Sequence, residues 1–111
     1  MRLILASDQS FLLKYGYDLT EITKNQMKIG WVTTASKGDR NKSFFNNLKN
    51  IISNTDYNFE EFDIEDKTKE EINLFFKDKN VIHIEGGNSF YLLRVIRETG
   101  FVEILKDLLN Q

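Results

Sequence analysis

The stretch that decides the fold is residues 80–93, which read NVIHIEGGNSFYLL. Three of its first six residues, Val81, Ile82 and Ile84, are apolar and β-branched, a pattern typical of a strand. A Gly-Gly-Asn turn at 86–88 then breaks the strand, and apolar residues recur at helical spacing from Phe90 onward. Gly100 stands where such a helix would have its C′ residue. This part of the chain therefore predicts a strand over 80–85, a tight turn and a helix that ends at Gly100.

The same alternation of apolar and amphipathic segments runs along the whole chain. Thr68 and Glu71 have the spacing of a capping box, which predicts the start of one of the helices. The predicted strands are 3–6, 28–35, 57–62 and 80–85, and the predicted helices are 11–22, 40–52, 68–76, 90–99 and 101–108. This order predicts an α/β fold, with a parallel sheet of about four strands and helices on both faces. The strand at 57–62 alternates only partly, which favours a place at the side of the sheet.

The end of the chain indicates an incomplete domain. Each helix in a fold of this kind leads into another strand, yet no strand follows the last helix. A four-stranded parallel sheet leaves an apolar edge unpaired, and such edges recruit other chains. We therefore expect one incomplete α/β domain over 1–111 that forms a homo-oligomer or pairs with a missing C-terminal half. We also expect poor cover for the inward stripe of the last helix, which is Phe101, Ile104, Leu105 and Leu108.

Composition narrows the class of protein. The 111 residues carry Lys+Arg 15 against Asp+Glu 17, so the formal net charge is -2 and there is no basic excess for nucleic acid. The apolar run at 3–6 is far shorter than the ~7–15 apolar residues of a signal peptide or the ~20 of a membrane span. The absence of cysteine excludes thiol catalysis, cysteine-based zinc sites and disulfides. We expect a cytoplasmic protein that binds neither nucleic acid nor membrane.

Ligands of open parallel sheets bind at the carboxyl ends of the strands. Three turns follow predicted strands, at 7–9, 34–38 and 85–89. The third is the most specific, because two glycines allow a close approach of backbone to ligand and the next helix presents free N–H groups. Such a turn can hold a carboxylate, a phosphate or the oxyanion of an acyl-transfer intermediate. The competing interpretation is a tight strand-to-helix turn with Asn88 or Ser89 as the N-cap.

Other candidate sites receive less support from the sequence. His83 alternates with apolar neighbours on its strand, so we expect it to pack with its ring nitrogens satisfied rather than to catalyse. Glu85 is expected to be a solvated residue at the rim. Ser89, His83 and Glu85 lie too far apart along a strand end to converge as a catalytic triad.

Nucleotide and metal sites are also disfavoured. The glycine turn lacks the third glycine of a dinucleotide fingerprint, and no Gly-Lys-Ser/Thr phosphate loop exists in the chain. An acidic cluster has no recognisable metal-ligand spacing and is expected to be a solvated face. Its members are Glu60, Glu61, Asp63, Glu65 and Asp66. We expect no metal and no cofactor.

Residues 81–93, followed by Arg97-Glu98-Thr99-Gly100, closely resemble the core segment of the peptidase E family of aspartyl dipeptidases and cyanophycinases. The first strand and the strand that ends in Thr-Ala-Ser at 34–36 are similar as well, so the resemblance spans nearly the whole chain. It implies a serine hydrolase on a class I glutamine amidotransferase-like fold, with small aspartyl peptides as substrates. It also implies that the Gly87 amide is an oxyanion-hole donor, that Gly86 shapes the turn and that Asn88 orders it.

Several features depart from the pattern of this family. No Gly-x-Ser-Ala-Gly nucleophile elbow occurs in the 111 residues, and Glu85 stands where relatives have a third glycine or another small residue. Without nucleophile or base an oxyanion donor cannot perform acyl transfer, so residues 1–111 are expected to be inactive alone. The alternative hypothesis is a non-catalytic α/β binding or assembly module. The sheet is expected to have the strand order typical of flavodoxin-like domains. The function of a flavodoxin or receiver domain is less favoured, because no acidic pocket or phosphoacceptor Asp is evident at a strand end.

Overall fold

The structure is a computed structural model that describes residues 21–36, 46–47, 49–50, 53 and 57–110. The predicted strand at 3–6, the turn at 7–9 and most of the helix at 11–22 lie outside these residues. The described elements are η1 (Lys24–Gln26), β1 (Lys28–Val32), η2 (Thr34–Ser36), β2 (Asn58–Phe62), α3 (Lys69–Phe76), β3 (Val81–Ile84), α4 (Ser89–Thr99) and α5 (Phe101–Leu109). Residues 46–47, 49–50 and 53 are also helical.

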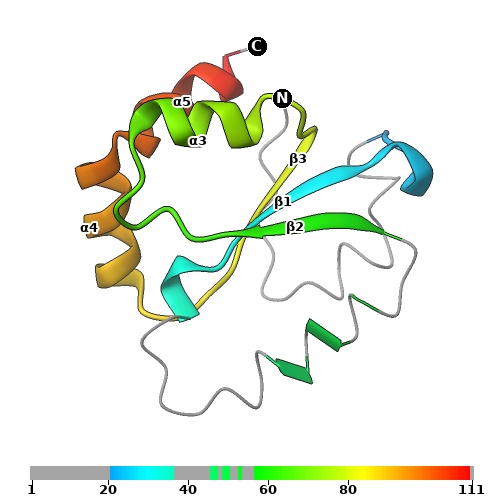
Figure 1. Cartoon of the computed structure of the whole chain (residues 1–111), viewed down its shortest axis with the longest axis horizontal. Helices are drawn as coiled ribbons and strands as arrows, with labels where there is room; N and C mark the ends of the chain where they lie inside the picture. Colours follow the sequence, from blue (N-terminus) through cyan, green and yellow to red (C-terminus); the bar gives the residue numbers. More distant parts are fainter. Residues whose placement is uncertain (1–20, 37–45, 48, 51–52, 54–56, 111) are drawn as a thin grey trace.

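The three described strands form one parallel sheet in the order β2-β1-β3 (Figure 1). The register places Trp31 of β1 opposite Glu61 of β2 and His83 of β3. This arrangement confirms the predicted α/β class with a parallel sheet, and the fold is consistent with an incomplete flavodoxin-like domain. The β2 strand lies beside β1 alone among the described strands, in agreement with its weak alternation.

The predicted strand at 28–35 is too long. The β1 strand ends at Val32, and residues 34–36 form the 3₁₀ turn η2. Local hydrogen bonds cause the early end, because the Ser36 amide and the Ser36 hydroxyl both donate to the Thr33 carbonyl. These bonds fold the chain back at the point where a strand would continue outward.

Helices α3, α4 and α5 gather on one side of the sheet (Figure 1). Alternation along β1 directs Gly30 and Val32 toward this side, where Val32 packs in a core with Ile72, Phe76, Val95 and others. Gly30 permits close approach of α3, since a Cβ there would lie 2.7 Å from the Phe76 ring. The main core therefore lies between the sheet and these three helices.

The opposite face of the sheet is aromatic. Ile29 and Trp31 point to this side and are buried. The Trp31 ring meets Phe59 edge to face, with ring centroids 5.8 Å apart. Lys49 lies in the described helical residues that precede β2 and pairs with Glu61 at 3.0 Å. Helical residues thus contact this face too, as predicted for a sheet with helices on both sides.

The predicted helix signals are confirmed, but the expected lack of cover on the last helix is wrong for Phe101 and Ile104. Thr68 and Glu71 form the capping box of α3, and Gly100 ends α4 with φ 78. Phe101 and Ile104 of α5 are buried, because the Phe101 ring stacks on Phe76 at 5.4 Å between centroids. The Leu105 and Leu108 side chains pack against the same core. The turn at Gly100 folds α5 back onto α3, which covers Phe101 and Ile104.

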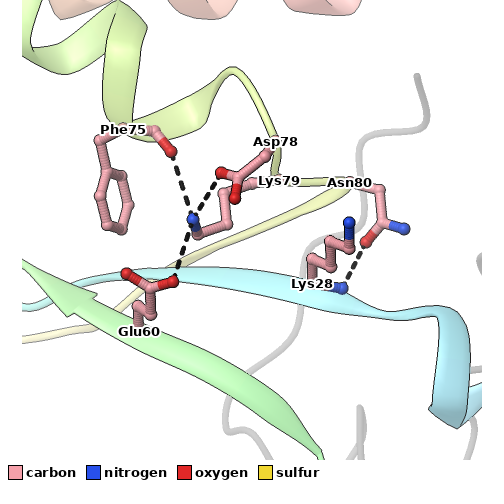
Figure 2. Close-up of polar contacts among 6 residues, drawn as sticks. All are labelled: Lys28, Glu60, Phe75, Asp78, Lys79 and Asn80. Atoms are coloured by element: carbon pink, nitrogen blue, oxygen red, sulfur yellow. Dashed lines mark hydrogen bonds and ion pairs between the residues drawn. The ribbon is translucent and has the colours of Figure 1, made fainter.

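Lys79 holds the amino-terminal edge of the sheet to α3 (Figure 2). Its ammonium group donates to the Phe75 carbonyl at 3.3 Å, lies 2.7 Å from Asp78 and pairs with Glu60 at 3.4 Å. Burial lowers the pKa of Lys79, but the two carboxylates outweigh that effect and raise it above its ordinary value. The hydrogen bond from Lys79 lowers the pKa of Asp78. On the β1 side, the neighbouring Asn80 side chain accepts a hydrogen bond from the Lys28 amide at 2.7 Å.

We predict that Lys79→Met lowers the free energy of unfolding by about 1 kcal/mol, because it removes the bond to the Phe75 carbonyl and the cation above the Phe75 ring. Because the Lys79 pKa is raised in the folded state, Lys79 stabilises the fold fully below pH ~10.4. This stabilisation is lost as the pH rises through the pKa of the folded state. Because the Asp78 pKa is lowered in the folded state, the stabilisation by Asp78 is complete above pH ~3.9. It is lost as the pH falls through the pKa of the folded state. Urea denaturation at pH 7 and pH 11 measures the Lys79 effect, and denaturation at pH 7 and below pH ~3 measures the Asp78 effect. The exposed neighbour Lys77 provides the control Lys77→Met, and an equal loss for both variants would contradict the prediction.

Candidate functional site

The carboxyl ends of the three strands meet at one rim of the sheet. The β1 strand leads into η2, whose Thr34, Ala35 and Ser36 are buried. The β3 strand leads into residues 85–88, which are called the glycine turn below. The Asn88 amide donates to the Ala35 carbonyl at 3.1 Å, so the two turns are in contact. The predicted placement of Ala35 and Gly87 at the same end of the sheet is therefore confirmed.

Gly87 is the position in the glycine turn that requires glycine. Its φ is 151, and a Cβ at this position would lie 2.3 Å from the Ala35 carbonyl oxygen. A Cβ on Gly86 would meet nothing within 4 Å. The structure thus places the steric constraint on Gly87, whereas the resemblance assigned the shaping of the turn to Gly86.

Asn88 links the glycine turn to α4. Its side-chain oxygen accepts a hydrogen bond from the Tyr91 amide at 3.0 Å, and its carbonyl accepts one from Leu92. Of the two N-cap candidates in the sequence, Asn88 is thus the cap, and Ser89 is an exposed residue at the first position of the helix. Because Asn88 is fixed by both its backbone and its side chain, it orders the start of α4.

The amides of Gly86 and Gly87 remain available in this arrangement. Within the part of the chain that the structure describes, neither amide donates to an acceptor. They lie just before the amino end of α4, where the helix dipole favours negative charge. Two unbonded N–H groups in a fixed turn can donate to an oxyanion, a carboxylate or a phosphate.

Glu85 differs from its predicted role. It is 7% exposed, not solvated, and its Oε2 atom accepts a hydrogen bond from Trp31 Nε1 at 3.0 Å. His83 Nε2 lies 3.4 Å from the same oxygen, in agreement with the packed role predicted for this histidine. The register supplies the physical reason, because it sets Trp31 beside His83 and next to the strand end. The sequence contains one Trp, and pairing of the Trp31 strand with the strand of His83 was the signal that could have identified Trp31 as the partner of Glu85.

A model of Peptidase family S51 matches residues 3–111. The chain belongs to this peptidase family. The match confirms the resemblance to peptidase E and supports a peptidase-like function in general. No curated protein and no solved structure matches the chain.

The acidic cluster of this family member is only partly a solvated face. Asp63 accepts hydrogen bonds from the Thr34 hydroxyl at 2.8 Å and from the Glu65 amide at 3.0 Å. The Thr34 hydroxyl in turn accepts from the Ile64 amide, and the Tyr91 hydroxyl donates to Glu65. These bonds tie the end of β2 to η2 and α4, so the rim is held from both sides.

Among the residues that have a described position, no group of three or more His, Cys, Asp or Glu residues could hold a metal ion. None of the helices described above is long and apolar enough to cross a membrane.

The glycine turn yields a prediction about stability. We expect Gly87→Ala to lower the free energy of unfolding by about 1–3 kcal/mol, because the methyl group meets the Ala35 carbonyl in a strained backbone conformation. Gly86→Ala is the matched control and should change stability by less than about 1 kcal/mol, since its methyl group has open space. Chemical denaturation of the three proteins measures the difference. Equal losses for the two variants would show that the turn has another conformation.

Proposed function

We propose that this chain supplies the oxyanion-hole turn of a serine peptidase, with the Gly87 amide as donor and the Gly86 amide beside it. The observation that carries the proposal is the pair of unbonded amides in a turn fixed against Ala35. Donors aimed at the position where negative charge develops stabilise the tetrahedral intermediate of acyl transfer. Family membership supports peptide hydrolysis as the reaction.

We further propose that the substrate is a small peptide with an N-terminal aspartyl residue, as the resemblance to peptidase E implies. The reaction also needs a nucleophile and a base, and the 111 residues contain no Gly-x-Ser-Ala-Gly segment. In this proposal the elbow serine and its partners come from sequence that follows Gln111 or from another chain. Residues 1–111 alone therefore bind and orient but do not cleave.

A peptidase assay tests this function. Purified residues 1–111 should leave aspartyl dipeptides intact, because removal of the triad leaves at most a weak effect of the oxyanion turn. Hydrolysis by this protein that is abolished by a serine-directed phosphonate and by Ser89→Ala would contradict the proposal.

Sequencing of the gene beyond codon 111 separates the peptidase hypothesis from the hypothesis of a non-catalytic module. A reading frame that continues through Gly-x-Ser-Ala-Gly supports the peptidase, and a stop codon favours the non-catalytic module.

The longer protein from such a frame provides the quantitative arm of the same test. Gly87→Ala should lower kcat for an aspartyl dipeptide by about 10²–10³-fold with little change in KM, because the clash of the methyl group with Ala35 moves the donor amide out of place, which is comparable to loss of one oxyanion donor. Gly86→Ala should retain most of the activity, since its side chain has open space. Unchanged kcat in a folded Gly87→Ala protein would refute the proposed role of this turn.

We also propose that another chain, either a second copy or a C-terminal half, covers part of this protein. Phe90 is 88% exposed and Leu93 is 45% exposed one helical turn further along α4. Light scattering at micromolar concentration should show a dimer or a larger oligomer, and Leu93→Asp should shift it toward monomer. A stable monomer of the unaltered chain would contradict self-association.

The cytoplasm is the compartment that we propose, because the chain has no cysteine and so lacks the disulfides that often mark exported proteins.

A further inference from the structure

The carboxyl group of Glu85 is buried directly before the glycine turn. Burial of a carboxyl group is costly unless hydrogen-bond donors compensate for the lost water. Glu85 Oε2 accepts a hydrogen bond from the Trp31 indole N–H at 3.0 Å, and His83 Nε2 lies 3.4 Å from the same oxygen. The Glu85 amide also donates to the Val32 carbonyl at 2.9 Å. Both the backbone and the side chain of Glu85 are thus bound to β1.

The location of this carboxyl group matters for the proposed function. A carboxylate next to the Gly86 and Gly87 amides would repel an oxyanion bound there. Alternation along β3 places Glu85 on the same face as His83, and its contacts hold the carboxylate against the aromatic side of the sheet. The hydrogen bond from the Trp31 indole fixes the carboxyl group there, with His83 Nε2 3.4 Å from the same oxygen.

We propose that His83, Glu85 and Trp31 form one unit that positions the glycine turn. In this unit Glu85 and His83 are positioning residues that act through the backbone of Gly86 and Gly87. His83 Nε2 lies 3.4 Å from Glu85 Oε2, and in the proposed unit it donates its N–H to this oxygen beside the indole N–H. The proposal rests on the proposed function, because it explains how an acidic residue is tolerated beside an oxyanion donor.

A double-mutant cycle on residues 1–111 tests the unit. His83→Leu removes one donor from the buried carboxylate, and Glu85→Gln removes the charge but keeps an acceptor for Trp31. We expect His83→Leu to raise the unfolding equilibrium constant about tenfold more in the unaltered chain than in the Glu85→Gln background. Glu98→Gln is the control, since Glu98 forms an exposed pair with Arg94. No coupling between His83 and Glu85 would overturn the proposal.

The second readout separates positioning from stability alone. The chain has one Trp and one His, so the indole N–H signal in a ¹H–¹⁵N NMR spectrum reports on this unit without overlap from another Trp. His83→Leu should shift the indole signal and the Gly86 and Gly87 amide signals, and His83→Gln should restore them in part because its amide can donate. Coupling without movement of the two glycine signals would also overturn the proposal.

Both readouts use the unliganded chain and need no peptidase activity. Failure of the unit therefore appears as uncoupled unfolding or unmoved glycine signals. Failure of the proposed function appears separately, as unchanged kcat in Gly87→Ala of the longer protein.

Discussion

The contact between Gly87 and the Ala35 carbonyl is the constraint on which the rim of this fold depends. An added Cβ at position 87 would lie 2.3 Å from that oxygen, so the two backbones approach as closely as glycine allows. The Asn88 amide then donates to the same carbonyl, and Asn88 caps α4. One carbonyl thus joins η2 to the glycine turn and to the start of α4. The amides of the two preceding glycines donate to no acceptor among the described residues and remain for a ligand.

The two faces of the sheet support the rim by different means. On the face covered by α3, α4 and α5, an apolar core that includes Val32, Phe76 and Phe101 holds the strands against the helices. On the opposite side Trp31 combines apolar burial with an indole N–H that reaches Glu85. Hydrophobic burial alone would not fix the direction of the strand end, whereas a hydrogen bond to a buried carboxylate does. The site therefore depends on a polar contact set inside an aromatic layer.

Local signals in the sequence predicted the parts of the fold that local physics determines. The Thr68 capping box, the Gly100 helix end and the glycine turn were all visible in a few neighbouring residues. Contacts between distant segments were predicted less well. The burial of Glu85 depends on the register that brings Trp31 beside β3, and the end of β1 at Val32 depends on the turn bonds of Ser36. The cover of α5 depends on its packing against α3.

The central claim is that the glycine turn holds two unbonded amides in a fixed position. Hydrogen exchange by NMR tests it most directly, because Gly87 and Asn88 are neighbours with opposite expected behaviour. The Asn88 amide, bonded to Ala35, should exchange slowly, whereas the Gly86 and Gly87 amides should exchange at rates close to those of an exposed peptide. Slow exchange at Gly87 would show that its amide already has a partner, and fast exchange at Asn88 would show that the turn is not held. Either result would contradict the account.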